Sequence, residues 1–206
     1  MENTIEIKNT VELLKRSLKK AITYKDYREL VANHVQQGTS SGPTQNEELA
    51  HYTLLNDSRM RRLDKTTKVP NAISNRFEKF RGNQTWLVLS ESWCGDAAQS
   101  LPIINKLAEM NEGIDLKLVL RDENPEMMNA FLTNGSMSIP KLIAIDTNTL
   151  EVLGDWGPRP SILKTMVDNF KAENGSLTPL FKQELQVWYN KNKGQNIAED
   201  LAGLLD

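Results

Sequence analysis

The sequence has one cysteine among its 206 residues, so it cannot form a disulfide bond within the chain. The composition therefore lacks the paired cysteines that are typical of proteins from oxidising compartments. The sequence also lacks an apolar run of about 18 residues, the minimum for a membrane-spanning helix. Residues 1–18 have no apolar core of the kind found in signal peptides. We therefore expect a cytoplasmic protein with no membrane partner.

An excess of charge of one sign is missing as well. The net charge is −2, and this balance gives no basis for binding nucleic acid. The two histidines, His34 and His51, have no cysteine or carboxylate at ligand spacing, so we expect no metal site. The charge is uneven, however: residues 1–83 carry a net +5 and residues 84–206 a net −7. This asymmetry favours two regions that attract each other.

Residues 1–83 are expected to form an all-helical N-terminal extension packed on the core, because apolar residues recur at helical spacing over 9–35 and 47–65. Asn46 is the expected N-cap of the second of these segments. Residues 38–46 have the composition of a loop, and we expect a flexible linker there. A basic face of the extension is expected to be solvated, although it could instead dock on the acidic domain or place a cation near the cysteine; it comprises Arg59, Arg61, Arg62, Lys65 and Lys68.

In residues 84–174 the pattern of apolar residues differs: short apolar runs alternate with segments that have helical spacing. The order predicts an α/β core, βαβαββα, with a mixed central sheet flanked by helices. A helix that opens at Pro125 is expected to end at 134–135. Residues 175–206 are expected to supply an extra C-terminal helix, followed by a segment, 197–205, that is either a docked helix or a frayed tail. The predicted strands are 86–89, 116–120, 141–145 and 151–156.

Cys94 follows a predicted buried strand and begins a predicted helix. Backbone N–H groups and the positive end of the helix dipole favour a thiolate at such a position, so we expect an exposed, reactive thiol. Asp96 places a negative charge nearby and opposes ionisation. Pro140 enters a predicted strand, where it cannot donate to the ladder, and we expect a cis peptide bond there.

These residues resemble a known family. Trp93-Cys94-Gly95-Asp96-Ala97 is similar to the Trp-Cys-Gly-Pro-Cys active site of thioredoxins, and Ser138-Ile139-Pro140 follows at the thioredoxin spacing. The resemblance covers residues 84–173 and implies a thioredoxin fold. The Leu55-Asn56 and Arg59-to-Arg62 stretches resemble the helical extension of a group of bacterial thioredoxin-like proteins without a settled role.

The resemblance implies that Cys94 is the catalytic thiol. Ala97 stands where thioredoxins have their resolving cysteine, so this chain alone cannot complete a dithiol cycle. The residues that the resemblance places in the substrate-binding groove are Trp93, Gly95, Asp96, Ile139 and Pro140.

Three functions are compatible with a motif of this kind. The first is monothiol thiol–disulfide exchange or dethiolation through Cys94, acting on protein thiols or disulfides. It needs no bound cofactor, only a low-molecular-weight thiol such as glutathione or bacillithiol as resolver and co-substrate. The second is a non-catalytic thioredoxin-fold interaction module. The third is a redox sensor that uses Cys94. The sequence does not define the oligomeric state. If the protein is an enzyme, it is expected to be a thiol–disulfide oxidoreductase of the monothiol type.

Overall fold

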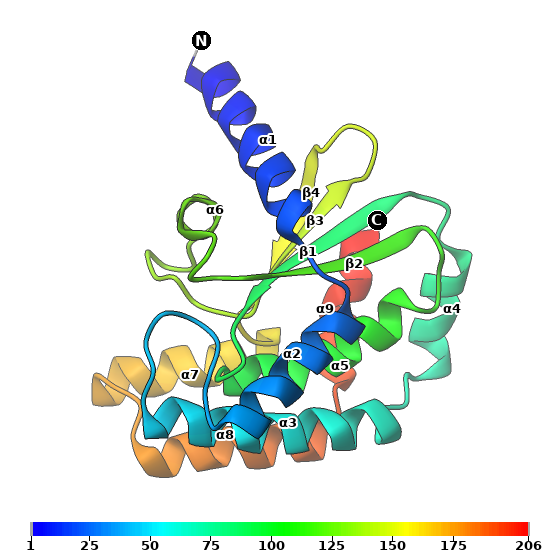
Figure 1. Ribbon diagram of the computed structural model, residues 1–206. Helices are drawn as coiled ribbons and strands as arrows, with labels where there is room; N and C mark the ends of the chain where they lie inside the picture. Colours follow the sequence, from blue (N-terminus) through cyan, green and yellow to red (C-terminus); the bar gives the residue numbers. More distant parts are fainter. Residues whose placement is uncertain (1, 206) are drawn as a thin grey trace.

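The computed structural model describes residues 2–205, with side chains from residue 9 onwards. Met1 and Asp206, the ends of the two predicted terminal parts, lie outside the described residues. A four-stranded sheet crosses the middle of the molecule in the order β2-β1-β3-β4 (Figure 1). β1 pairs with β2 in parallel and with β3 antiparallel, and β3 pairs antiparallel with β4. The strands are β1 (Gln84–Ser90), β2 (Ile114–Leu120), β3 (Lys141–Asp146) and β4 (Val152–Trp156).

Three helices complete the core in the predicted order βαβαββα, with a mixed sheet. β1 is buried along its whole length, which explains its continuous apolar run. The second core helix is shorter than predicted. It ends at Ala130 because residues 133–136 form a turn, closed by a bridge between Thr133 and Ser136. The core helices are α5 (Gly95–Ala108), α6 (Pro125–Ala130) and α7 (Ser161–Asn174).

The N-terminal extension is helical, as expected. The predicted helical segment 9–35 is divided into two helices. The first ends at Lys20, and Thr23 begins the second with a capping box, in which its side chain accepts a hydrogen bond from the backbone N–H of Asp26. Asn46 caps the third helix, and its side chain accepts from the N–H of Leu49 at 2.8 Å. The helices of the extension are α1 (Glu2–Lys20), α2 (Tyr24–Gln37), α3 (Glu47–Thr66) and α4 (Asn71–Lys79).

The link between α1 and α2 lies along the outer edge of β2. Ile22 and Leu118 form an isolated antiparallel bridge in which each N–H donates to the other's carbonyl at 2.9 Å. α1 also contacts α6. The extension is therefore attached to the sheet through main-chain bonds as well as through side chains.

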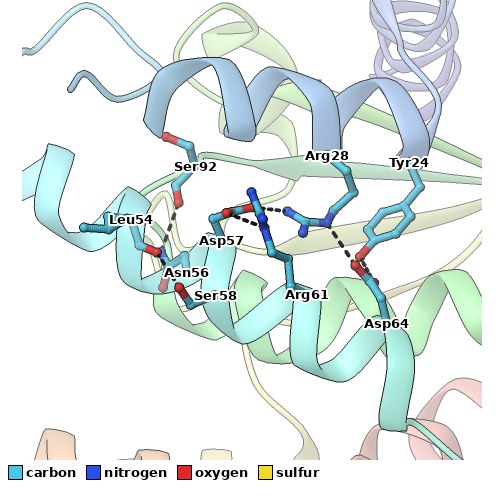
Figure 2. A network of polar contacts seen from close by, with 9 residues as sticks. All are labelled: Tyr24, Arg28, Leu54, Asn56, Asp57, Ser58, Arg61, Asp64 and Ser92. Carbon is cyan, nitrogen blue, oxygen red and sulfur yellow. Dashed lines mark hydrogen bonds and ion pairs between the residues drawn. The ribbon is translucent and has the colours of Figure 1, made fainter. Parts of the chain in front are cut away.

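A network of ion pairs joins α2 to α3 (Figure 2). Arg28 donates to Asp57 at 3.0 Å and to Asp64 at 3.1 Å, and the Tyr24 hydroxyl donates to Asp64 at 2.6 Å. Arg61 reaches Asp57 from the solvent side at 2.7 Å. The side chains of Arg28 and Asp57 are 15% and 5% exposed, so this pair within the network is largely withdrawn from water. It fixes α2 and α3 to each other.

Two further helices follow the core, α8 (Pro179–Asn192) and α9 (Gln195–Ala202), and the 3-10 turn η1 (Gly203–Leu205) ends the described chain. α9 is a docked helix, which decides between the two alternatives for 197–205: Ile197 and Leu201 are fully buried, and α9 contacts α4, α5 and α7. Figure 1 shows α8 running alongside α3 on the far side of α5 from the sheet. Over the described residues, none of the helices is long and apolar enough to cross a membrane.

Candidate functional site

The end of β1 delivers Cys94 to the first turn of α5. Cys94 is the N-cap of this helix, and its sulfur accepts the Ala97 N–H at 3.4 Å, as a side-chain cap would. The thiol in turn donates to the carbonyl oxygen of Ile139 at 3.3 Å. The Ile139–Pro140 peptide bond is cis. The motif and the proline segment, 45 residues apart, therefore meet at the sulfur.

The expected exposure of Cys94 is wrong, because the residue is only 7% exposed. Burial raises the pKa of the Cys94 thiol to about 12, and the charge of Asp96 adds to the increase. The backbone N–H groups of Ala97 and Asp96, and the Arg159 cation, oppose that increase without cancelling it. The helix terminus acts on the sulfur as predicted, but desolvation is the larger effect. The resting form is a protonated thiol.

Asp96 is held from two distant parts of the chain. Arg159, in the segment between β4 and α7, pairs with Asp96 Oδ2 at 2.6 Å, and the Tyr189 hydroxyl on α8 donates to Oδ1 at 3.0 Å. Burial raises the pKa of the Asp96 carboxyl above its ordinary value, and Arg159 and Tyr189, which bind the charged form, reduce this increase without cancelling it. Both partners are arranged for the carboxylate, and in that form its negative charge acts on the Cys94 thiol. Neither Arg159 nor Tyr189 was predicted as a partner of Asp96. The only signal in the sequence was the position of Arg159 between two prolines.

Side chains from α3 and α8 cover the motif. A Cβ atom at Gly95 would lie 3.5 Å from Nη1 of Arg59 and 3.8 Å from Nε2 of Gln186. Gln99 donates to Gln186 at 2.9 Å, and Arg62 donates to Asn190 on α8 at 2.8 Å. The prediction of a solvated face is therefore wrong for Arg59, which is partly buried, whereas Arg62 stays exposed although it donates to α8. Arg59 also places a positive charge near Asp96. The alternative left open by the sequence was that this face places a cation near Cys94, and the cation that acts on the Cys94 thiol is instead Arg159.

The loop 38–46 is not a flexible linker, because it is bonded to the segment that leads into the motif. The Ser41 N–H donates to the Ser92 hydroxyl at 2.9 Å, and the Ser92 N–H donates to the Ser41 hydroxyl at 2.8 Å. Ser41 also donates to the buried carboxyl of Glu91, whose pKa is raised by burial. Asn56 on α3 donates to the Ser92 carbonyl at 3.0 Å (Figure 2). The extension thus holds the backbone that precedes Cys94.

Trp93, on the other side of the sulfur, is half-buried and packs against a cation: the guanidinium carbon of Arg121 lies 4.9 Å from the ring centre. Arg121 is fixed by Asp122, to which it donates at 2.7 Å. Ile139 and Pro140 are both buried. The structure therefore brings the predicted groove residues together around Cys94. Side chains of the protein itself, however, fill the space around the sulfur. Among the described side chains, those of residues 9–205, we find no group of three or more His, Cys, Asp or Glu that could hold a metal.

Comparison with known proteins supports the resemblance. Residues 42–171 match a family model described as thioredoxin. A crystal structure of a protein of unknown function from Pseudomonas aeruginosa is 16% identical, with a TM-score of 0.52 over 76% of this chain and 81% of that one. A crystal structure of an HIV epitope scaffold is also 16% identical, with a TM-score of 0.55 over 89% of this chain and 97% of that one. At this identity the two structures support the fold alone. No curated protein matches the chain.

Proposed function

The chain belongs to the thioredoxin family, and from that premise we propose that it is a monothiol thiol–disulfide exchange protein that acts through Cys94 in the cytoplasm. The observation that carries the proposal is the position of the sulfur, 3.4 Å from the Ala97 N–H and 3.3 Å from the Ile139 carbonyl. A thiolate formed there would gain the helix-terminal N–H groups as donors. Ala97 excludes resolution within the chain, so an external thiol is required.

In the proposed reaction, the Cys94 thiolate attacks the small-molecule sulfur of an S-thiolated protein. The protein leaves as a thiolate and takes up a proton, and Cys94 is left in a mixed disulfide with the small thiol. A second molecule of that thiol, glutathione or bacillithiol in class, attacks the mixed disulfide as its thiolate. Cys94 is regenerated and the symmetrical small disulfide leaves. Overall, the S-thiolated protein and one free small thiol give the protein thiol and the symmetrical small disulfide: the protein sulfur is reduced, the sulfur of the incoming thiol is oxidised, and the number of disulfide bonds is unchanged.

The experiment compares the wild type with Cys94→Ser in the release of glutathione from a glutathionylated protein. We expect the wild type to turn over and Cys94→Ser to fall to background, because serine cannot form the mixed disulfide. Circular dichroism of the variant checks that the fold is retained. Equal, background-level release by both proteins would contradict the exchange function.

The raised pKa of Cys94 gives a second expected result. Its alkylation by iodoacetamide should accelerate about tenfold per pH unit from pH 6 to pH 10, because the thiolate fraction keeps rising until the pH reaches the pKa of about 12. Free glutathione in the same assay should level off near the ordinary thiol pKa of about 8.5. If the rate of Cys94 alkylation reached a plateau below pH 9, the pKa of Cys94 would not be raised, which would contradict this prediction.

The burial of Cys94 also favours a second function, a non-catalytic interaction module whose surface, rather than its thiol, holds a protein partner. In that case Cys94→Ser should retain every partner of the wild type. Loss of the partners together with the thiol would count against it. A redox sensor would react with peroxide directly through Cys94, so rapid modification of Cys94 by peroxide at neutral pH would favour that third function instead.

A further inference from the structure

Cys94 is closed off from solvent, although exchange requires direct contact between its sulfur and a disulfide. The residue is only 7% exposed, and thiolate attack needs a path to the sulfur. A disulfide therefore reaches Cys94 only after an element beside the motif has moved. The segments that surround the motif are held to different degrees, and this difference identifies the element that moves.

Most of the surroundings of the sulfur are firmly fixed. Residues 139–140 of the proline segment are buried. The Trp93 ring packs against the guanidinium of Arg121. α3 is joined to α2 by the ion pair of Arg28 with Asp57, in which both side chains are largely buried. Moving any of these segments would disrupt core packing or a buried ion pair, and both are costly.

α8 contacts the motif through polar side chains. The Tyr189 hydroxyl donates to Asp96 at 3.0 Å, and Gln186 accepts from Gln99 at 2.9 Å. α8 buries three of its 14 residues, whereas α9 buries five of its eight. Hydrogen bonds between side chains can be exchanged for bonds to water at a small net cost. Of the elements beside the motif, α8 therefore separates from it most easily.

The two links of α8 to the rest of the chain have the backbone of hinges. Gly175, at the end of α7, has a φ of 76°, and no atom lies within 4 Å of the position that its Cβ would take. Lys193 and Gly194, between α8 and α9, have φ values of 54° and 82°. A few residues at the ends of an element absorb the change in φ and ψ when that element moves. Figure 1 shows α8 at the outside of the molecule, connected to α7 and α9 by these links.

The second link is also held on the core. A Cβ atom at Gly194 would lie 2.3 Å from Cδ1 of Ile103 on α5, so the chain packs closely on α5 at this point. Beyond it, Ile197 and Leu201 of α9 are fully buried. A movement of α8 can therefore end at Gly194 and leave α9 and α5 in place.

We propose that α8 is a lid over Cys94, and that a disulfide reaches the sulfur only after α8 has moved away from the motif. The inference rests on the proposed function, because it names the step that admits the substrate. Opening breaks the bond between Tyr189 and Asp96 and admits water to the sulfur. The ion pair of Asp96 with Arg159 lies outside α8 and stays in place. Burial is the main cause of the raised pKa of Cys94, so the thiol ionises more readily once the lid is open.

The test measures the rate at which iodoacetamide alkylates Cys94 at pH 7.5. Leu185 is 4% exposed on α8, and we expect Leu185→Ala to accelerate alkylation about tenfold or more, because fewer buried contacts then hold the lid closed. Val187→Ala, on the same helix but 49% exposed, should react as the wild type does. Leu14→Ala, the same truncation at a fully buried position of α1, should change the rate less than about twofold.

Hydrogen exchange reports on the lid itself. In the wild type, the amides of α8 should exchange faster than those of α5, and Leu185→Ala should accelerate both α8 exchange and alkylation by the same factor. A second measurement needs no variant. Low concentrations of urea should accelerate alkylation and α8 exchange of the wild type with a common slope, smaller than the slope for α5, because opening the lid exposes less surface than unfolding the core.

An equal rate of alkylation in Leu185→Ala and the wild type would overturn the proposal. So would an acceleration by Leu14→Ala as large as that by Leu185→Ala, or α8 amides that exchange as slowly as those of α5. The two proposals fail separately. If Cys94→Ser and the wild type release glutathione at the same background rate while alkylation follows α8, exchange is wrong and the lid remains. If release depends on Cys94 but alkylation does not follow α8, the lid alone is wrong.

Discussion

Replacing Asp96 with asparagine should accelerate the reaction of Cys94 with iodoacetamide between tenfold and a hundredfold at pH 7.5. The Asp96 charge raises the Cys94 pKa, and a decrease of about 1 to 2 in that pKa makes the thiolate fraction at pH 7.5 about tenfold to a hundredfold larger. Asparagine keeps an oxygen for the Tyr189 hydroxyl but removes the charge. The Arg159 cation, which already lowers the Cys94 pKa, is then no longer neutralised by its partner.

The companion variant Arg159→Gln distinguishes an electrostatic effect on the Cys94 pKa from an opening of the site around Cys94. It removes a cation and leaves the Asp96 carboxylate unneutralised, so the Cys94 pKa should rise and alkylation should slow. If opening of the site controlled the rate, both variants would react faster, because each breaks the same ion pair. Asp115→Asn, which removes an exposed carboxylate on β2 paired with Lys117, is the control and should change neither rate. Acceleration by Arg159→Gln would contradict the electrostatic explanation.

Arg28→Met should lower the free energy of unfolding by about 2 to 4 kcal/mol, because it removes one partner of a buried ionic network. Methionine fills much of the same volume but leaves Asp57, whose side chain is 5% exposed, with Arg61 alone. Asp64 keeps only the Tyr24 hydroxyl. Urea denaturation followed by circular dichroism measures the change.

The matched control is Arg16→Met, which removes an arginine paired with Glu126 where both side chains are more than half exposed. Such surface pairs contribute at most about 1 kcal/mol. A loss for Arg28→Met no greater than for Arg16→Met would show that the network contributes little to stability. The Arg28→Met loss should also weaken the support that α3 gives to Ser92 through Asn56, so hydrogen exchange at Ser92 should be faster in this variant.

The core elements were predictable because their patterns are local. The uninterrupted apolar run of β1 reports burial on both faces, and the turn formers 146–149 separate the strands of a hairpin. In α7, apolar residues at helical spacing do not all face the core. Leu163 and Val167 are buried, whereas Ile162 is 51% exposed, because the side of α7 that carries it is left uncovered. The local spacing of apolar residues predicts the helix, but it does not predict how much of the helix surface the rest of the protein covers.

The motif located the sulfur but did not give its environment. The contacts that decide the pKa of Cys94 connect residues far apart in sequence, such as Tyr189 with Asp96 and Ile139 with Cys94. The segment 38–46 illustrates the same limit. Its glycines and hydroxyls are typical of a mobile loop, yet pairing between Ser41 and Ser92 holds it in place. Composition shows that a segment is polar, but not that a distant segment supplies the matching polar groups.

The bridge between Ile22 and Leu118 has a consequence for assembly. β2 forms one border of the sheet, and its main-chain groups at Leu118 are already bonded to the link between α1 and α2. A strand from another molecule cannot add along that border without first displacing the link. The β2 border of the sheet is thus already occupied at Leu118 by the protein's own main chain, which opposes edge-to-edge aggregation through β2.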